Sequence, residues 1–243
     1  MNADDSNNVI LQILAMRRAT GSPAEWNAIK KAQARKIAGK IEQDKSQEFA
    51  KYIERCFMSV CDELHVFEMA RDWPQKSEFE KLTIAGDIIN RFVKRVQSDM
   101  NTGRARKYND MVVEPAPEIS VSRAAGGLMS VSSNGTVNIN PDWPFYNDLA
   151  RFLMDLRHEA THIVDIFFPC LSPLRPDILA KARIFYVDGR DDFGLYKENP
   201  LELNANTWRR EFGDIVRAKI ALCEYNRIRG ILGNKMGGTV RGR

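Results

Sequence analysis

The chain contains 243 residues, 44% hydrophobic and 28% charged, which is the balance of an ordinary soluble globular protein. Its net charge of +4 is small and spread along the chain, so a nucleic-acid partner is not expected. The apolar runs are all too short to cross a bilayer, and no membrane span is predicted.

The N-terminus and the cysteines bear on the compartment in which the chain folds. The first eight residues are polar and acidic, and they lack the basic and apolar regions of a signal peptide. The spacing of Cys56, Cys61, Cys170 and Cys223 is typical of neither a metal site nor a disulfide framework. We therefore expect a cytoplasmic protein, or one that is exported without a cleavable signal peptide.

Residues 1–107 are predicted to form a helical N-terminal region. Apolar side chains recur at helical steps in a short segment, 8–18, and in a long one from residue 23 to about residue 71. A break in the long segment is expected near residues 44–46. The histidine of this region, His65, is interpreted as a packed or surface residue rather than a metal ligand.

The composition then changes to short runs rich in β-branched residues and separated by proline and glycine. These runs predict strands at residues 111–113, 118–122, 128–132 and 136–140. Asn134 and Gly135, between the last two, are a strong signal for a two-residue hairpin turn. A small sheet is therefore expected directly before the next helix.

That helix, predicted from about residue 146 to residue 168, carries an H-E-x-x-H sequence that begins at His158 and ends at His162. Residues four apart lie one above the other on a helix, so both imidazoles can bind the same metal ion. Glu159 lies one step round the helix, where it can reach a water on that metal and act as a general base.

A polar stripe follows the same helix at the helical period. It contains Arg151, Asp155, His158, His162 and Asp165. Because metal-binding histidines usually donate their outer ring nitrogen to a carboxylate or carbonyl, Asp155 and Asp165 are candidates for that contact.

A catalytic zinc site needs a third protein ligand, with water in the fourth position. A histidine six residues after His162 is excluded, because Phe168 occupies that place. The best-placed acid downstream is Glu202, in the first turn of a helix predicted to begin at residues 199–200 and to continue to about Leu222.

Other interpretations of the acids remain open. Asn199 and Glu202 also fit a capping box, in which Glu202 would only satisfy the start of its own helix. Glu198 is the next candidate ligand, followed by the loop acids Asp188, Asp191 and Asp192.

These residues resemble zinc metallopeptidases of the gluzincin kind, in which the two histidines of H-E-x-x-H and a later glutamate hold the metal. The stretch from Tyr196 through Asn199-Pro200-Leu201-Glu202 to Ala205 is similar to the pattern around the glutamate ligand of small bacterial zincin domains. Some of those domains are effector or toxin peptidases. The resemblance covers about residues 128–215, roughly a third of the chain.

The resemblance implies a zinc-dependent peptidase that hydrolyses a protein or peptide. Zn²⁺ would be held by His158, His162 and Glu202, and Glu159 would activate the water. A peptide would bind as an added antiparallel strand, for which the predicted edge is the strand 136–140. The group that stabilises the oxyanion is left open among Tyr186, Tyr196, Arg183 and Arg190.

Departures from the family pattern limit what can be carried over. Thermolysin-like enzymes have an asparagine before the glutamate ligand and an aspartate four residues after it, whereas this chain has Leu201 and Asn206 at those places. A close relative of thermolysin is therefore not expected, and no substrate class is implied.

The sequence thus predicts an α+β, zincin-like fold, with a small mixed sheet and an active-site helix behind the helical N-terminal region. Residues 108–229 form the predicted catalytic region, and residues 230–243 a flexible basic tail. Two rival functions are kept. One is a binding or structural protein that keeps a zincin fold without cleaving, and the other is an enzyme that uses the same triad for a different hydrolysis. The sequence does not indicate an oligomeric state.

Overall fold

The computed structural model describes residues 11–13, 15–102, 118–124, 129–132 and 134–237. The chain forms two compact units, each assembled from three separate segments. The first contains residues 1–53, 96–116 and 160–208, and the second contains residues 54–95, 117–159 and 209–243. The division into an N-terminal, a catalytic and a tail region stays a prediction.

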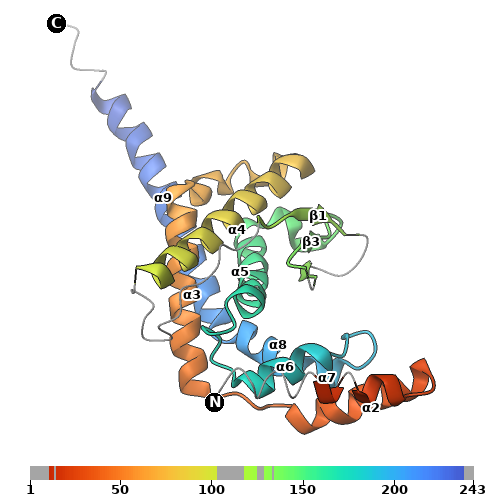
Figure 1. The fold of residues 1–243 in the computed structure, drawn as a ribbon. Helices are drawn as coiled ribbons and strands as arrows, with labels where there is room; N and C mark the ends of the chain where they lie inside the picture. The colour runs from red at the N-terminus through yellow and green to blue at the C-terminus, as the bar shows by residue number, and fades with distance from the viewer. Residues whose placement is uncertain (1–10, 14, 103–117, 125–128, 133, 238–243) are drawn as a thin grey trace, which may run out of the picture. The chain divides into compact units, whose positions relative to one another are not determined.

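The first unit is built largely from short helices, which lie together in Figure 1: α2 (Pro23–Ile37), α6 (Pro176–Ile184), α7 (Phe193–Lys197) and α8 (Pro200–Asn206). Both α2 and α8 contact α6 and α7. Their shared core is aliphatic and is formed by Ile37, Leu174, Ile178, Leu179, Ala182 and Leu201. This packing fixes the positions of α6 and α8, which frame the candidate site described below.

The break predicted in the long N-terminal helix occurs earlier than expected. Helix α2 ends at Ile37 and α3 (Gln43–Glu63) begins before the predicted break at residues 44–46. Gly39 has a left-handed φ of 70°, which glycine adopts at little cost, and its amide donates to the Glu198 carbonyl at 2.9 Å. The position of the break is therefore set by this glycine and by a distant hydrogen bond.

The second unit has an aromatic core. It contains α4 (Glu78–Asn101) as far as Arg95, α9 (Arg209–Gly237) and the 3-10 helices η1 (Val66–Ala70), η2 (Trp73–Gln75) and η3 (Pro144–Asn147). The ring of Phe57 lies 6.0 Å from that of Phe92 and 5.8 Å from that of Phe212. Trp73 packs against Phe152 at 4.9 Å, and its indole nitrogen donates to the Tyr146 carbonyl at 3.0 Å.

The C-terminal helical segment differs from the prediction at both ends. Helix α8 stops at Asn206, and Trp208 takes a left-handed φ of 65° before α9 begins, so the single helix predicted to run to Leu222 is wrong. Leu222 is exposed. Helix α9 also includes residues 230–237, which were expected to belong to the flexible tail. The rest of that tail lies outside the described residues.

Within the described residues, three short strands form one mixed sheet: β1 (Val121–Arg123), β2 (Met129–Val131) and β3 (Val137–Ile139). Strands β2 and β3 pair antiparallel, which confirms the predicted hairpin. Its turn is longer than the predicted two residues, because the Ser132 amide donates to the Thr136 carbonyl at 2.9 Å. Gly135 in this turn has a positive φ of 87°. The strand predicted at residues 111–113 lies outside the described residues.

The strand order β1-β3-β2 corrects one prediction. Strand β3 was expected to be the edge along which a peptide adds, but it pairs with β1 in parallel on one side and with β2 on the other. Both rows of its backbone groups are therefore already used. Among the described strands β1 and β2 are the outer ones, so the prediction that 136–140 forms the peptide-binding edge is wrong.

The mostly helical chain with one small mixed sheet confirms the predicted α+β class. Throughout the part of the chain that the structure describes, no helix is both long enough and apolar enough to span a membrane.

The aromatic core yields a first prediction, on stability. Trp73 is fully buried, and Trp73→Ala is expected to lower the free energy of unfolding by about 3–5 kcal/mol, because it leaves a cavity and removes the hydrogen bond to Tyr146. Denaturant unfolding followed by circular dichroism measures this change. Phe79→Ala is the control, since Phe79 is 78% exposed and its loss is expected to stay within about 0.5 kcal/mol. Equal effects of the two substitutions would contradict the assigned core.

Candidate metal centre

The two histidines of the H-E-x-x-H sequence lie on α5 (Leu149–Phe167), which confirms the predicted helix. The apolar face of α5 is buried through Phe152, Leu153, Leu156, Ala160 and Ile163. His158 and Glu159 are also buried, and His162 is half-buried one turn further along. The helix therefore directs both imidazoles to the same side, away from its apolar face.

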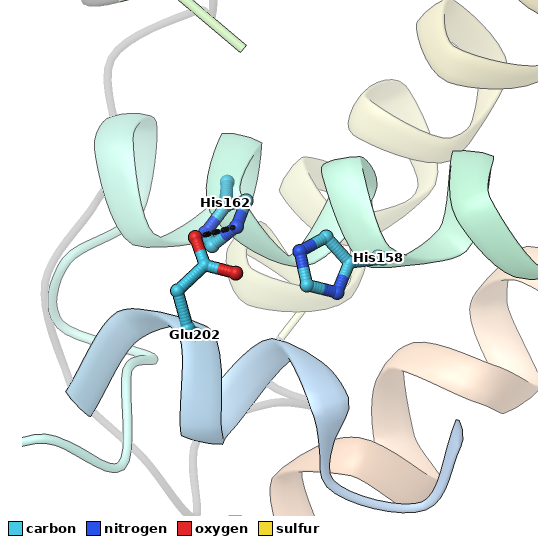
Figure 2. Close-up of side chains that lie close together, drawn as sticks. All are labelled: His158, His162 and Glu202. Atoms are coloured by element: carbon cyan, nitrogen blue, oxygen red, sulfur yellow. Dashed lines mark ion pairs between the residues drawn. The ribbon is translucent and has the colours of Figure 1, made fainter. Parts of the chain in front are cut away.

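Glu202 is positioned by the start of α8. The side-chain oxygen of Asn199 accepts a hydrogen bond from the Leu201 amide at 2.9 Å, and Pro200 occupies the first helical position. The Asn199 amide group donates to the Ala182 carbonyl at 3.2 Å, which ties α8 to α6. Asn199 thus caps the helix, while the Glu202 carboxylate lies against a histidine of α5 (Figure 2).

His158, His162 and Glu202 converge. Each offers one ligand atom, and these atoms all lie within 4.8 Å of one another (Figure 2). The Nε2 atom of His162 is 3.3 Å from Oε1 of Glu202, whose side chain is 2% exposed. A group with this spacing could hold a metal ion.

The donor atoms of the three residues restrict which metal ions could bind. Two imidazole nitrogens and one carboxylate oxygen make up a ligand set used by catalytic zinc, whereas calcium and magnesium prefer oxygen ligands throughout. The Glu202 carboxylate is buried beside His162, and a divalent cation held there would balance its charge. The residues therefore fit a divalent transition-metal ion, and zinc is one such ion.

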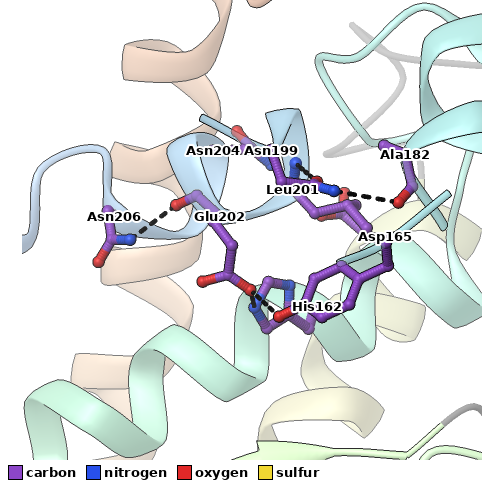
Figure 3. A network of polar contacts seen from close by, with 9 residues as sticks. His162, Asp165, Ala182, Asn199, Leu201, Glu202, Asn204 and Asn206 are labelled. Carbon is purple, nitrogen blue, oxygen red and sulfur yellow. Dashed lines mark hydrogen bonds and ion pairs between the residues drawn. The ribbon is translucent and has the colours of Figure 1, made fainter. Parts of the chain in front are cut away.

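Further polar contacts surround Glu202. The Tyr186 hydroxyl donates to Oε1 of Glu202 at 2.8 Å, so that this oxygen faces both Tyr186 and His162. The side-chain amide of Asn206 donates to the backbone carbonyl of Glu202 at 2.9 Å (Figure 3). Both the carboxylate and the backbone of Glu202 are thus hydrogen-bonded.

Asp165, one of the two predicted partners of the histidines, is buried close to the site. The Asn204 side chain donates to Oδ2 of Asp165 at 3.4 Å (Figure 3). Burial raises the pKa of the Asp165 carboxyl, while a hydrogen bond from Ser172 and the charges of His162 and Arg183 act in the opposite direction. The influence of Asp165 on His162 is therefore electrostatic.

Asp155, the other predicted partner, serves a different group. It lies 3.1 Å from Nε of Arg151 and also pairs with Arg209. Burial raises the pKa of Asp155, and both arginines oppose that shift. Both carboxylate oxygens of Asp155 thus contact arginines of α5 and α9, and its contact with a histidine ring stays a prediction.

The other acids that the sequence offered as ligands lie outside the triad. Glu198 is exposed, Asp188 pairs with Arg190 at 2.9 Å, and Asp192 caps α7 by accepting from the Leu195 amide at 3.2 Å. Asp191 is exposed. None of these acids belongs to the group of residues that could hold a metal in the described structure.

Of the four candidates for stabilising an oxyanion, Tyr186 contacts the triad. The Tyr196 ring packs edge-on against Tyr186 at 6.1 Å, and Arg183 lies near Asp165. Arg190 is exposed beside Asp188.

Sequence reasoning missed the buried arginine that precedes the motif. Arg157 is fully buried, and its guanidinium lies 5.9 Å from the centre of the Phe212 ring. Burial lowers the pKa of Arg157 to about 10, against the charge of Glu54. The only signal in the sequence is an arginine directly after the apolar residue Leu156 on a helix that is otherwise apolar on that side.

Comparison of the chain with family models, with curated proteins and with solved structures gave no match. The inference of function therefore rests on the residues of the triad and on their geometry.

Proposed function

We propose that the protein is a zinc-dependent metallopeptidase with a zincin-like active site that hydrolyses a protein or peptide. In this proposal His158, His162 and Glu202 bind Zn²⁺, and Glu159 is the general base. The observation that carries it is the convergence of the triad, with Glu159 directly after the first histidine on the same helix.

The chemistry follows from the residues. Zinc, when bound, would supply a Lewis acid that polarises the scissile carbonyl and makes water a better nucleophile. Glu159 takes a proton from the attacking water as the water oxygen forms a bond to the carbonyl carbon. When the C–N bond breaks, the same carboxyl delivers the proton to the amine nitrogen, so that peptide and water become an acid and an amine.

The burial of Glu159 supports this role. Its side chain lies on the helix that carries both histidines and is only 6% exposed as a residue. Burial shields this carboxylate from bulk water, and its place directly after the first histidine is the position from which the general base of an H-E-x-x-H site acts.

The test is the metal content of the purified full-length protein together with its peptidase activity. We expect one zinc per chain, cleavage of peptides from a mixed library, loss of cleavage after removal of zinc by a chelator, and recovery when zinc is returned. Absence of bound metal, with His158→Ala leaving the protein unchanged, would remove the metal centre. Bound metal without cleavage would favour a non-cleaving zincin-fold binding protein. Cleavage of a different bond would favour the same triad in another hydrolysis.

A further inference from the structure

Tyr186 makes a contact that the proposed reaction does not use. Its hydroxyl donates to Oε1 of Glu202 at 2.8 Å, an ordinary length for a hydrogen bond from a hydroxyl group. The same oxygen lies 3.3 Å from Nε2 of His162. Tyr186 therefore holds one oxygen of the carboxylate beside a histidine of the triad.

The position of the Tyr186 ring is fixed by its neighbours in the first unit. The ring is half-buried against the aliphatic core that includes Leu179 and Leu201. On its other side it meets the Tyr196 ring edge-on at 6.1 Å, and Tyr196 in turn stacks on Phe193 at 6.2 Å and 14°. The hydroxyl thus approaches Glu202 from a packed support rather than from a mobile side chain.

The turn before α7 packs against the rings of Tyr196 and Phe193. A Cβ atom built on Gly189 would lie 3.3 Å from Cγ of Tyr196 and 3.6 Å from Cδ2 of Phe193. The backbone at Gly189 therefore packs against both rings, and a Cβ atom there would require the Tyr196 ring to shift slightly. Tyr196 is held between this turn and Tyr186.

We propose that Tyr186 is a positioning residue that orients the Glu202 carboxylate for metal binding. The inference rests on the metal site of the proposed function, and it does not depend on which bond the enzyme cleaves. A glutamate side chain has several rotamers, and a metal ion that binds it must fix one of them. Because Tyr186 and the backbone contact from Asn206 hold Glu202 in advance, less freedom is lost when the ion binds.

The experiment compares zinc affinities. Tyr186→Phe keeps the ring and its packing and removes only the hydroxyl. It is expected to weaken zinc binding about 10–100-fold, the usual effect of removing a hydrogen-bond partner of a ligand. Affinity is measured by competition with a chromogenic zinc chelator. The visible absorption of the Co²⁺-loaded protein, which reports the ligand geometry, is expected to change as well.

The matched control is Tyr196→Phe, which removes a hydroxyl from the neighbouring ring and keeps the same packing. Its zinc affinity and Co²⁺ spectrum are expected to equal those of the wild type. Thermal unfolding of the metal-free proteins checks that both variants fold. An unchanged affinity and spectrum in Tyr186→Phe, with zinc still bound by the wild type, would overturn the inference while leaving the proposed function intact.

A double-mutant cycle tests whether Tyr186 acts through Glu202. If it does, adding Tyr186→Phe to Glu202→Ala causes no further loss of zinc affinity, since the carboxylate that it positions is already gone. The same loss in both backgrounds would show a general structural effect and would also overturn the inference. A wild-type protein that binds no zinc would contradict the proposed function itself.

Discussion

Glu159→Gln is expected to lower kcat/KM for peptide hydrolysis by about 10²–10⁴-fold, the usual contribution of a general acid–base group. Glutamine has nearly the same size and keeps a carbonyl oxygen, so the packing around this buried position is preserved. Glutamine cannot accept the proton of the attacking water. The proton transfer that assists both the attack of water and the cleavage of the C–N bond is therefore lost. Steady-state kinetics on a peptide substrate measures the change.

The control for Glu159→Gln is Glu198→Gln. Glu198 is an exposed acid that was the next candidate ligand from the sequence, and its replacement is expected to leave activity unchanged. Zinc content of both variants should equal that of the wild type, because neither residue is among the three that could hold the metal. A Glu159→Gln protein that kept both its zinc and its full activity would show that another group moves the proton.

The features that sequence alone could predict are local. The spacing of His158 and His162 on α5 follows from helical periodicity, and the hairpin follows from Asn134 and Gly135, since both depend on residues close in the chain. Glu202 could be predicted as a ligand because Asn199 and Pro200 mark the start of α8, which carries it in its first turn. In each case the physical cause lies within one turn or one hairpin.

The features that sequence could not predict depend on distant partners. The central place of β3 arises from its parallel pairing with β1, and strand alternation carries no signal for such a pairing. The end of α8 at Asn206, just before the left-handed Trp208, could likewise not be predicted from periodicity, because apolar residues continue at helical steps beyond it. A prediction from spacing therefore extended one helix through a backbone turn.

The candidate site shows the same limit. Asp155 has the right spacing for a partner of His158, yet Arg209 from α9 binds its carboxylate. No local sequence pattern predicts this contact. Tyr186 was one of four equal candidates until α6 and α8 brought its hydroxyl to Glu202. Helical spacing determined which side chains share a face, while tertiary packing determined which of them meet.

His162→Ala removes a proposed ligand, and it is expected to weaken zinc binding strongly. Loss of a hydrogen-bond partner of a ligand usually lowers metal affinity about 10–100-fold, and loss of the ligand itself should lower it further. A ligand that binds only the folded state stabilises it by about 2.7 kcal/mol when its free concentration is a hundred times Kd. Zinc should therefore raise the Tm of the wild type and leave that of His162→Ala almost unchanged. Calorimetry with and without zinc measures both values.

The matched control replaces the remaining histidine of the chain. His65 is exposed, pairs with Glu68 at 3.2 Å and has a left-handed φ of 52°, so asparagine, which tolerates that backbone conformation, is the suitable substitute. His65→Asn should keep both the zinc affinity and the zinc-dependent rise in Tm. If His162→Ala and His65→Asn responded to zinc alike, the stabilising ion would bind elsewhere. The contact between His162 and Glu202 would then be an ordinary buried ion pair.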